Sequence, residues 1–258
     1  MTTEIKNSQN VPIENGLVAF FDILGYAQLI NNDELENVIQ TIEKSFVDVI
    51  KKHSDKWEKM LPTNGDFVPE CLIFSDSILV TLPIPTANIE ILLVSYAVAF
   101  GIFCQILVAK LFESGLPVRG AISIGKFYVK KHPPIFAGRP IVEAHQLCNS
   151  LELAGCVISP ASESAFGVFS SLFQSYSVPI KDKGKQKLYL LDYFSFLKDK
   201  VGFCRQTVIE SFKAHNKHIP LEVIGKVNNT VEFLEHCKVN EKKRRKLASK
   251  VKPIKLAA

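Results

Sequence analysis

Apolar positions recur along this chain in two alternating patterns, continuous or alternating runs typical of strands and longer stretches with helical spacing. Short turn segments separate these stretches. One is the Ser75-Asp76 pair between two apolar runs, which is typical of a β-hairpin. The predicted elements are strand 16–22, helix 24–53, strands 67–74 and 77–84, helix 87–114 ending at Gly115, strand 116–130 with a ribbon turning at Pro133-Pro134, helix 139–155, strand 156–160, short helix 161–167 and strand 186–194.

The order of these elements, β-α-β-β-α-β with additions, predicts an α+β fold of the ferredoxin-like type, in which helices cover one face of a sheet. The strands stop near residue 199, and two amphipathic helices follow at 201–217 and 221–239. These helices pack either on the sheet domain or on a partner chain. We divide the chain into a flexible N-terminus (1–15), a sheet domain (16–198), a helical appendage (199–240) and a basic tail (241–258).

Composition excludes a disordered chain, since 47% of the 258 residues are hydrophobic. Much of the net charge of +5 comes from the tail segment EKKRRKLASKVKPIK. A charge run of this kind is typical of a solvated tail or of weak phosphate contacts, and no aromatic or zinc pattern indicates specific nucleic-acid recognition. The six cysteines lie far apart, without a signal peptide before them, which indicates reduced thiols in a cytoplasmic protein.

Residues 91–109, ILLVSYAVAFGIFCQILVA, are long and apolar enough to cross a bilayer. Polar residues such as Ser95 and Gln105 interrupt the segment, and no positive cluster flanks its start. A helix that is apolar nearly all round is also typical of a large core or an interface between subunits. We therefore expect a buried helix and no membrane span.

Two acidic residues, Asp22 and Asp76, each follow a nearly pure apolar strand. In the ferredoxin-like order the ends of these strands can lie side by side, and two adjacent carboxylates repel each other unless a proton or cation intervenes. Hard divalent ions such as Mg²⁺ and Mn²⁺ prefer oxygen ligands of this type. The alternative is that each carboxylate only accepts backbone N–H bonds in its own turn.

Four segments carry a resemblance to the class III nucleotidyl cyclases. AFFDILGYAQLI resembles the F-x-D-I-x-G-F opening of that family, and CLIFSDSILV resembles its second metal segment. GLPVRGAISIGKFYV and GRPIVEAHQLCNSLELAGCVISP are similar to the strand and helix that follow, in the same order, so the resemblance covers residues 16–192. Within that family, FFDILGY, IFSDSILV and VRGAISIGKFY look more like the pyrimidine cyclases of the bacterial anti-phage Pycsar systems than like the animal adenylyl or guanylyl cyclases.

The resemblance implies a head-to-tail homodimer with active sites at the interface. It implies cyclisation of UTP to 3′,5′-cyclic UMP and pyrophosphate, with a separate cyclic-nucleotide effector sensing the product in anti-phage defence. Cyclisation of CTP, or a catalytically inactive nucleotide-binding homologue, remains the alternative. Two Mn²⁺ or Mg²⁺ ions are expected at Asp22, Asp76 and the carbonyl of Ile23. The turn amides of Leu24, Gly25 and Tyr26 are expected to contact phosphate oxygens.

The chain departs from the family pattern at several positions. Val142 and Gln146 stand where the family helix carries Asn and the transition-state Arg, and a neutral amide cannot replace a guanidinium at a charged transition state. The candidate substitutes are Arg119, which we expect to be catalytic, Lys126, and Arg139, which we expect to bind substrate. The alternatives are an inter-strand or surface ion pair for Arg119 and a solvated side chain for Arg139.

The expected base pocket also departs from the pattern. Leu72 stands where the resemblance implies the purine-selecting polar residue, and Ser75 stands in place of a glycine. We expect both to border the substrate; the alternative for the Ser75 hydroxyl is that it only closes the turn. Because Leu72 cannot hydrogen-bond a base edge, the change agrees with a non-purine substrate.

Overall fold

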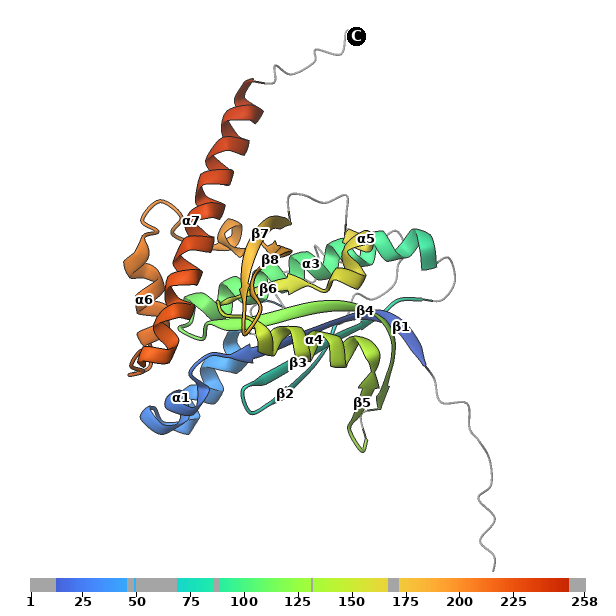
Figure 1. The fold of residues 1–258 in the computed structure, drawn as a ribbon. Helices are drawn as coiled ribbons and strands as arrows, with labels where there is room; N and C mark the ends of the chain where they lie inside the picture. Colours follow the sequence, from blue (N-terminus) through green and yellow to red (C-terminus); the bar gives the residue numbers. More distant parts are fainter. Residues whose placement is uncertain are drawn as a thin grey trace, which may run out of the picture.

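The structure of the 258-residue chain is a computed structural model that describes residues 13–45, 49, 69–85, 89–130, 132–166 and 172–250. Its strands and helices alternate in the order expected for a mixed α/β protein (Figure 1). They are β1 (Glu14–Ile23), α1 (Tyr26–Asn32), β2 (Glu70–Phe74), β3 (Ser77–Pro83), α3 (Ile89–Glu113), β4 (Val118–Lys130), β5 (Ile135–Gly138), α4 (Arg139–Ser150), β6 (Gly155–Ile158), η1 (Pro160–Ser162), α5 (Glu163–Phe166), β7 (Phe173–Ile180), β8 (Gly184–Leu191), η2 (Tyr193–Phe196), α6 (Arg205–Lys213) and α7 (Leu221–Lys250).

The strands form one sheet in the order β2-β3-β1-β4-β6-β8-β7, and β5 pairs with β4. The first four strands follow the ferredoxin-like order, with β1 central and antiparallel to both β3 and β4. The predicted fold class is therefore confirmed. The expectation of helices on one face was incomplete, because α3 and α4 lie on opposite faces of the sheet (Figure 1).

Helix α3 is the core helix of the domain. Within the part of the chain that the structure describes, Leu92–Glu113 is the one segment apolar and long enough to cross a membrane, and 72% of its apolar window is buried. The buried Gln105 amide donates to the carbonyls of Leu172 and Asp192 at 2.9 and 3.0 Å. Packing inside the fold thus accounts for the apolar composition, as expected for a buried helix, and for the polar residue within it.

Several predicted boundaries were wrong. The first strand begins at Glu14, and the helix expected over 24–53 is broken after Asn32, with a new helical stretch at 35–45. Helix α4 ends at Ser150, because Leu151 takes an extended conformation and bridges to Ile180. The expected loop at 54–66 lies outside the described residues.

Strand β7 was missed by the sequence interpretation. Its Pro179 argues against a central strand, but β7 is the edge of the sheet, where a missing N–H donor is tolerated. The strand pairs along its full length with β8. Sequence alone did not reveal that the sheet ends here.

The C-terminal helices pack on the sheet domain of the same chain. Asn229 donates to the carbonyl of Glu152 at 2.7 Å, and the hydroxyl of Thr230 accepts from the amide of Ala154 at 2.8 Å. Helix α7 also continues through residues 241–250, which the sequence predicts as the start of the basic tail. Asn240 and Arg244 in its C-terminal half still contact Gln174 on β7 and Asp192, and its last turns project beyond the sheet domain (Figure 1).

Candidate active site

Asp22 lies near the end of the central strand β1, opposite Ser77 on β3 and Arg119 on β4. Its side chain is 15% exposed, so the carboxylate is largely withdrawn from water but still accessible. The strand ends one residue later, and the chain turns through Leu24 and Gly25 into α1. The register of three strands therefore fixes the position of this carboxylate.

Asp76 lies in the turn between β2 and β3, next to Ser75, whose φ of 56° is left-handed. The backbone amide of Ile23 donates to the carbonyl of Asp76 at 2.8 Å, which joins this turn to the end of β1. The sequence-based expectation that Asp22 and Asp76 lie side by side agrees with this geometry.

The pKa of Asp22 is raised above its ordinary value of 3.8. Burial is the largest cause, and the neighbouring Asp76 carboxyl adds to it, while the hydrogen bond and positive charge of Arg119 act in the opposite direction. The site thus holds a partly desolvated pair of acids, which is the condition that a bound cation relieves.

Arg119 is ion-paired with Asp22 in this chain. Its Nε donates to Oδ2 of Asp22 at 2.7 Å, and the side chains of Arg119 and Asp22 are 18% and 15% exposed. The other guanidinium nitrogens donate to the carbonyl and the side-chain oxygen of Asn149 at 2.9 and 3.3 Å. These contacts use three of the five guanidinium N–H donors, so one N–H on each terminal nitrogen remains for a phosphate oxygen.

The turn after β1 offers fewer amides to a ligand than expected. The Leu24 amide already donates to the carbonyl of Pro117 at 2.9 Å, as the Ile23 amide does to Asp76. Gly25 has a φ of 78°, a conformation that favours glycine, and begins the short helix α1 at Tyr26. The turn amides of Gly25 and Tyr26 are therefore the better placed donors for a phosphate.

Leu72 and Ser75 lie on the β2–β3 hairpin that carries Asp76. Leu72 is half-buried on the edge strand β2 and pairs with Leu79, and Ser75 is exposed. Both can therefore border a ligand bound at the acid pair.

Arg139 is separated from the acid pair in this chain. It follows Gly138, which pairs with Phe127, and Phe127 pairs with Glu14 at the other end of β1. Eight strand residues separate Glu14 from Asp22, roughly 26 Å. The Arg139 side chain is 88% exposed and pairs with Glu143 at 2.9 Å, so any contact with a substrate would involve the site of another subunit.

Lys126 is exposed on β4 and pairs with Asn15, the second residue of β1. It therefore lies towards the end of β1 that is distant from Asp22. Of the candidate cations, only Arg119 is brought to Asp22.

Helix α4 brings residues to the acid pair that the sequence did not single out for it. It runs antiparallel to β4, so that Asn149 orients Arg119 and the ring of His145 packs edge-on against Phe20, with ring centroids 4.9 Å apart. The side chains of Val142 and Gln146 are exposed on this helix. Only the packing of α4 on the sheet could reveal the role of Asn149.

The donor set fits a hard divalent cation. Asp22 and Asp76 offer carboxylate oxygens and the Ile23 carbonyl is adjacent, an all-oxygen set of the kind that Mg²⁺ or Mn²⁺ completes with water and phosphate. Among the described residues no group of three or more His, Cys, Asp and Glu side chains gathers to form a closed metal cage.

The chain has the fold of a class III nucleotidyl cyclase catalytic domain. It is similar to the dimeric guanylyl cyclase domain of the RhoGC fusion protein from the fungus Blastocladiella emersonii, with a TM-score of 0.50 and 14% identity over 70% of this chain and 97% of that one. It is also similar to a bacterial light-regulated adenylyl cyclase, with a TM-score of 0.50 and 10% identity over 80% of this chain and 57% of that one.

The guanylate cyclase domain of RhGC from Catenaria anguillulae, solved in complex with GTP, has a TM-score of 0.48 and 14% identity over 70% of this chain and 97% of that one. No protein-family model and no curated protein sequence matches the chain. At these identities the likeness establishes the fold alone.

Proposed function

We propose that this protein is a nucleotidyl cyclase that converts UTP to 3′,5′-cyclic UMP and pyrophosphate. The observation that carries the proposal is the pairing of Asp22 and Asp76 at the end of β1, on the catalytic-domain fold of the class III cyclases. In this reaction the ribose 3′ oxygen attacks the α-phosphorus, and pyrophosphate leaves with the electrons of the P–O bond.

The roles of the residues follow from their positions. Asp22, Asp76 and the Ile23 carbonyl would hold two Mn²⁺ or Mg²⁺ ions, which would lower the pKa of the 3′ hydroxyl and neutralise the leaving group. The backbone amides of the Gly25 turn donate hydrogen bonds to phosphate oxygens. Arg119, already seated on Asp22, supplies the positive charge that Gln146 lacks.

The pyrimidine preference is supported by the base-pocket residues. Leu72 has no hydrogen-bonding group with which to select a purine edge. The exposed Ser75 hydroxyl can donate to or accept from a pyrimidine base. Preference for uracil over cytosine, and the role of the product as a second messenger in anti-phage defence, rest on the sequence resemblance.

We further propose a homodimer with its sites at the interface. Large apolar side chains are exposed on the β2–β3 hairpin, the β5 ribbon and α4, and covering them by a second subunit would stabilise the assembly. The exposed residues are Ile73, Phe74, Ile135 and Val142. In such a dimer Arg139 and Gln146 would face the site of the partner.

A second candidate function is nucleotide binding without turnover. The observation that favours it is the Arg119–Asp22 ion pair. In this pair the guanidinium that would stabilise the transition state neutralises a carboxylate that would bind metal. In that case the protein would bind a nucleoside triphosphate and release it unchanged.

The deciding experiment is incubation of the full chain with Mn²⁺ and each of the four nucleoside triphosphates, followed by mass spectrometry of the products. Cyclic UMP from UTP, lost in Asp76→Asn, is expected. Cyclic CMP from CTP alone would indicate the cytidylate alternative. The absence of any cyclic product, with retained nucleotide binding by calorimetry, would contradict cyclase activity and support the inactive homologue.

A further inference from the structure

A pocket of about 550 Å³ lies between α6 and α7, apart from the acid pair. One face of α6 lines it with residues spaced at i, i+4 and i+8, which are Arg205, Ile209 and Lys213. The remaining lining comes from the α6–α7 loop and the start of α7, namely Lys217, His218, Ile219, Ile224, Val227 and Asn228.

The chemistry of this lining is uneven. Arg205 and Lys213 stand at the two ends of α6, roughly 12 Å apart along the helix axis, with Ile209 between them. None of the described residues that line the pocket is acidic. An anion placed here gains attraction from several sides, and the aliphatic side chains between the charges favour an apolar body.

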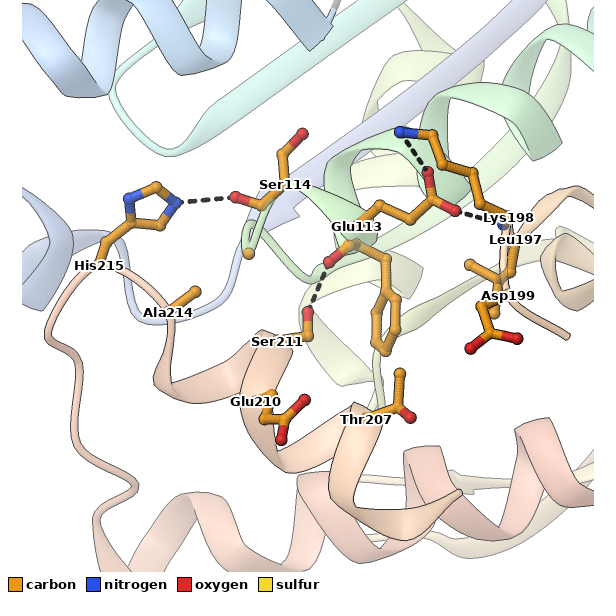
Figure 2. Close-up of a pocket in the computed structure, with 12 residues that line it drawn as sticks. Glu113, Ser114, Leu197, Lys198, Asp199, Thr207, Glu210, Ser211, Ala214 and His215 are labelled. Atoms are coloured by element: carbon orange, nitrogen blue, oxygen red, sulfur yellow. Dashed lines mark hydrogen bonds and ion pairs between the residues drawn. The ribbon is translucent and has the colours of Figure 1, made fainter. Parts of the chain in front are cut away.

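The neighbouring pocket on the other side of α6, about 580 Å³ in volume, lacks this selectivity (Figure 2). It mixes Lys198 with the acids Glu113, Asp199 and Glu210, and these carboxylates already accept hydrogen bonds from Lys198, Gly202 and Gln206. Its charges are satisfied within the protein, so they do not define a ligand.

We propose that the pocket between α6 and α7 binds a small amphipathic anion, with a carboxylate or phosphate group and an aliphatic or flat apolar body. The anionic group lies at Lys213 and His218, whose side chains are exposed and can turn towards it, while the charge of Arg205 at the other end of α6 attracts it over a longer distance. The apolar body covers Ile209, Ile224 and Val227. Asn228 accepts a hydrogen bond from Arg205 and holds that guanidinium at the edge of the pocket.

The same loop that lines this pocket is attached to the turn after β1. The Lys217 stem packs on Gly25, since a Cβ there would lie 3.4 Å from its Cδ, and Nζ of Lys217 donates to the carbonyl of Gly115 at 2.7 Å. The amide of His218 donates to Oε1 of Gln28 at 2.9 Å.

Three further contacts join the loop to the C-terminal ends of α1 and α3. Asn32 donates to the carbonyl of Asn216 at 2.9 Å. His215 lies between the carbonyl of Ser114 and the carboxylate of Asp33, at 2.8 and 3.2 Å, and Figure 2 shows the first of these contacts. An occupant that orders the loop therefore also orders the Gly25 turn, and regulation of catalysis by this route rests on the proposed function.

Binding is tested by calorimetry on the full chain, with decanoate, decyl phosphate and neutral decanol below their aggregation concentrations. Both anions are expected to bind at one site at least tenfold more tightly than decanol, acetate or inorganic phosphate. Lys213→Glu weakens binding at least tenfold. The control Lys242→Glu, exposed on α7 about 21 Å along the helix from the pocket, leaves it unchanged. Equal affinity for decanol, or equal weakening in both variants, overturns the site.

The coupling is measured separately by hydrogen exchange of peptides that span residues 22–32. Saturating decanoate is expected to slow exchange there at least fivefold in the wild type and not in Lys213→Glu. Unchanged exchange despite binding overturns the coupling. Neither experiment uses a nucleotide. Both can therefore be interpreted even if the protein proves to have no cyclase activity.

Discussion

The Nε of Arg119 donates to the Oδ2 of Asp22 at 2.7 Å, across the paired strands β1 and β4. With Asp76 beside Asp22, three charged groups thus converge, two negative and one positive. The guanidinium offsets part of the repulsion between the acids and leaves a net negative site. Under the proposed function, this net negative site would attract a cation, and Arg119 would lie beside the bound phosphate.

Asp22→Asn is expected to reduce cyclic-product formation by at least about a thousandfold, because it removes a ligand for the cations. The fold should survive. Because burial raises the native-state pKa of Asp22 above 3.8, the native state holds more protons than the unfolded chain in the window between the two values, and stability falls as pH rises through it. The variant should lack this fall and unfold at pH 7 no more easily than the wild type.

Product formation and thermal unfolding at pH 4 to 7 check this expectation. The matched control is Asp182→Asn, in the exposed β7–β8 turn, where the φ of 59° suits asparagine. A marked loss of stability in Asp22→Asn at pH 7 would show instead that the carboxylate is structural.

Arg119→Met is expected to raise the pKa of Asp22 further, because the hydrogen bond and charge that now lower it are removed while burial remains. The titration midpoint of the Asp22 carboxyl, followed by ¹³C NMR, should move to higher pH. Arg119→Lys should move it less. The exposed β8 variant Lys187→Met serves as the control, and an unmoved midpoint in Arg119→Met would contradict the ion pair.

Lys217 should make stability rise with pH above neutrality. Burial lowers its pKa from 10.5 to about 8, so between these values the unfolded chain holds a proton that the native protein lacks. The unfolding free energy should therefore increase by about 3 kcal/mol across this window.

Urea unfolding of Lys217→Met from pH 7 to 11 checks this dependence. The variant should lack the rise and be the less stable protein at pH 11, because it also loses the hydrogen bond to Gly115. Parallel curves for wild type and variant would mean that Lys217 keeps its ordinary pKa.

Arg244→Met is expected to destabilise the protein by about 3 kcal/mol or more, since it removes the cation paired with the fully buried Asp192. The double variant Asp192→Asn with Arg244→Met should recover much of this loss, because no charge is then left buried. Urea denaturation measures both. A small effect of Arg244→Met, matched by the exposed control Lys242→Met, would show that the end of α7 does not stabilise the sheet domain.

The sequence by itself determined the order of the first four strands and the acid that follows each of two apolar runs, but not strand β7 at the edge of the sheet. The apolar runs before Asp22 and Asp76 are local patterns. In the ferredoxin-like order the ends of these two strands lie side by side, so the two acids are expected to be neighbours. The long apolar helix could also be predicted from local sequence, because a helix of that length and composition is either buried in the protein or inserted in a membrane. Breaks inside helices, such as those after Asn32 and Ser150, could not, because they depend on contacts with distant residues.

Only the tertiary structure decided which cation meets Asp22. From the sequence we expected Arg119 to be catalytic and Arg139 to bind substrate, with Lys126 as a further candidate, but local pattern did not show which of them meets Asp22; the β1–β4 register places Arg119 at the acid and the other two towards the opposite end of the strand. The attachment of the C-terminal loop to the Gly25 turn was equally hidden, because it joins residues almost 200 positions apart. Local pattern fixes which side chains end each element, whereas the partners across a sheet follow from long-range register and packing.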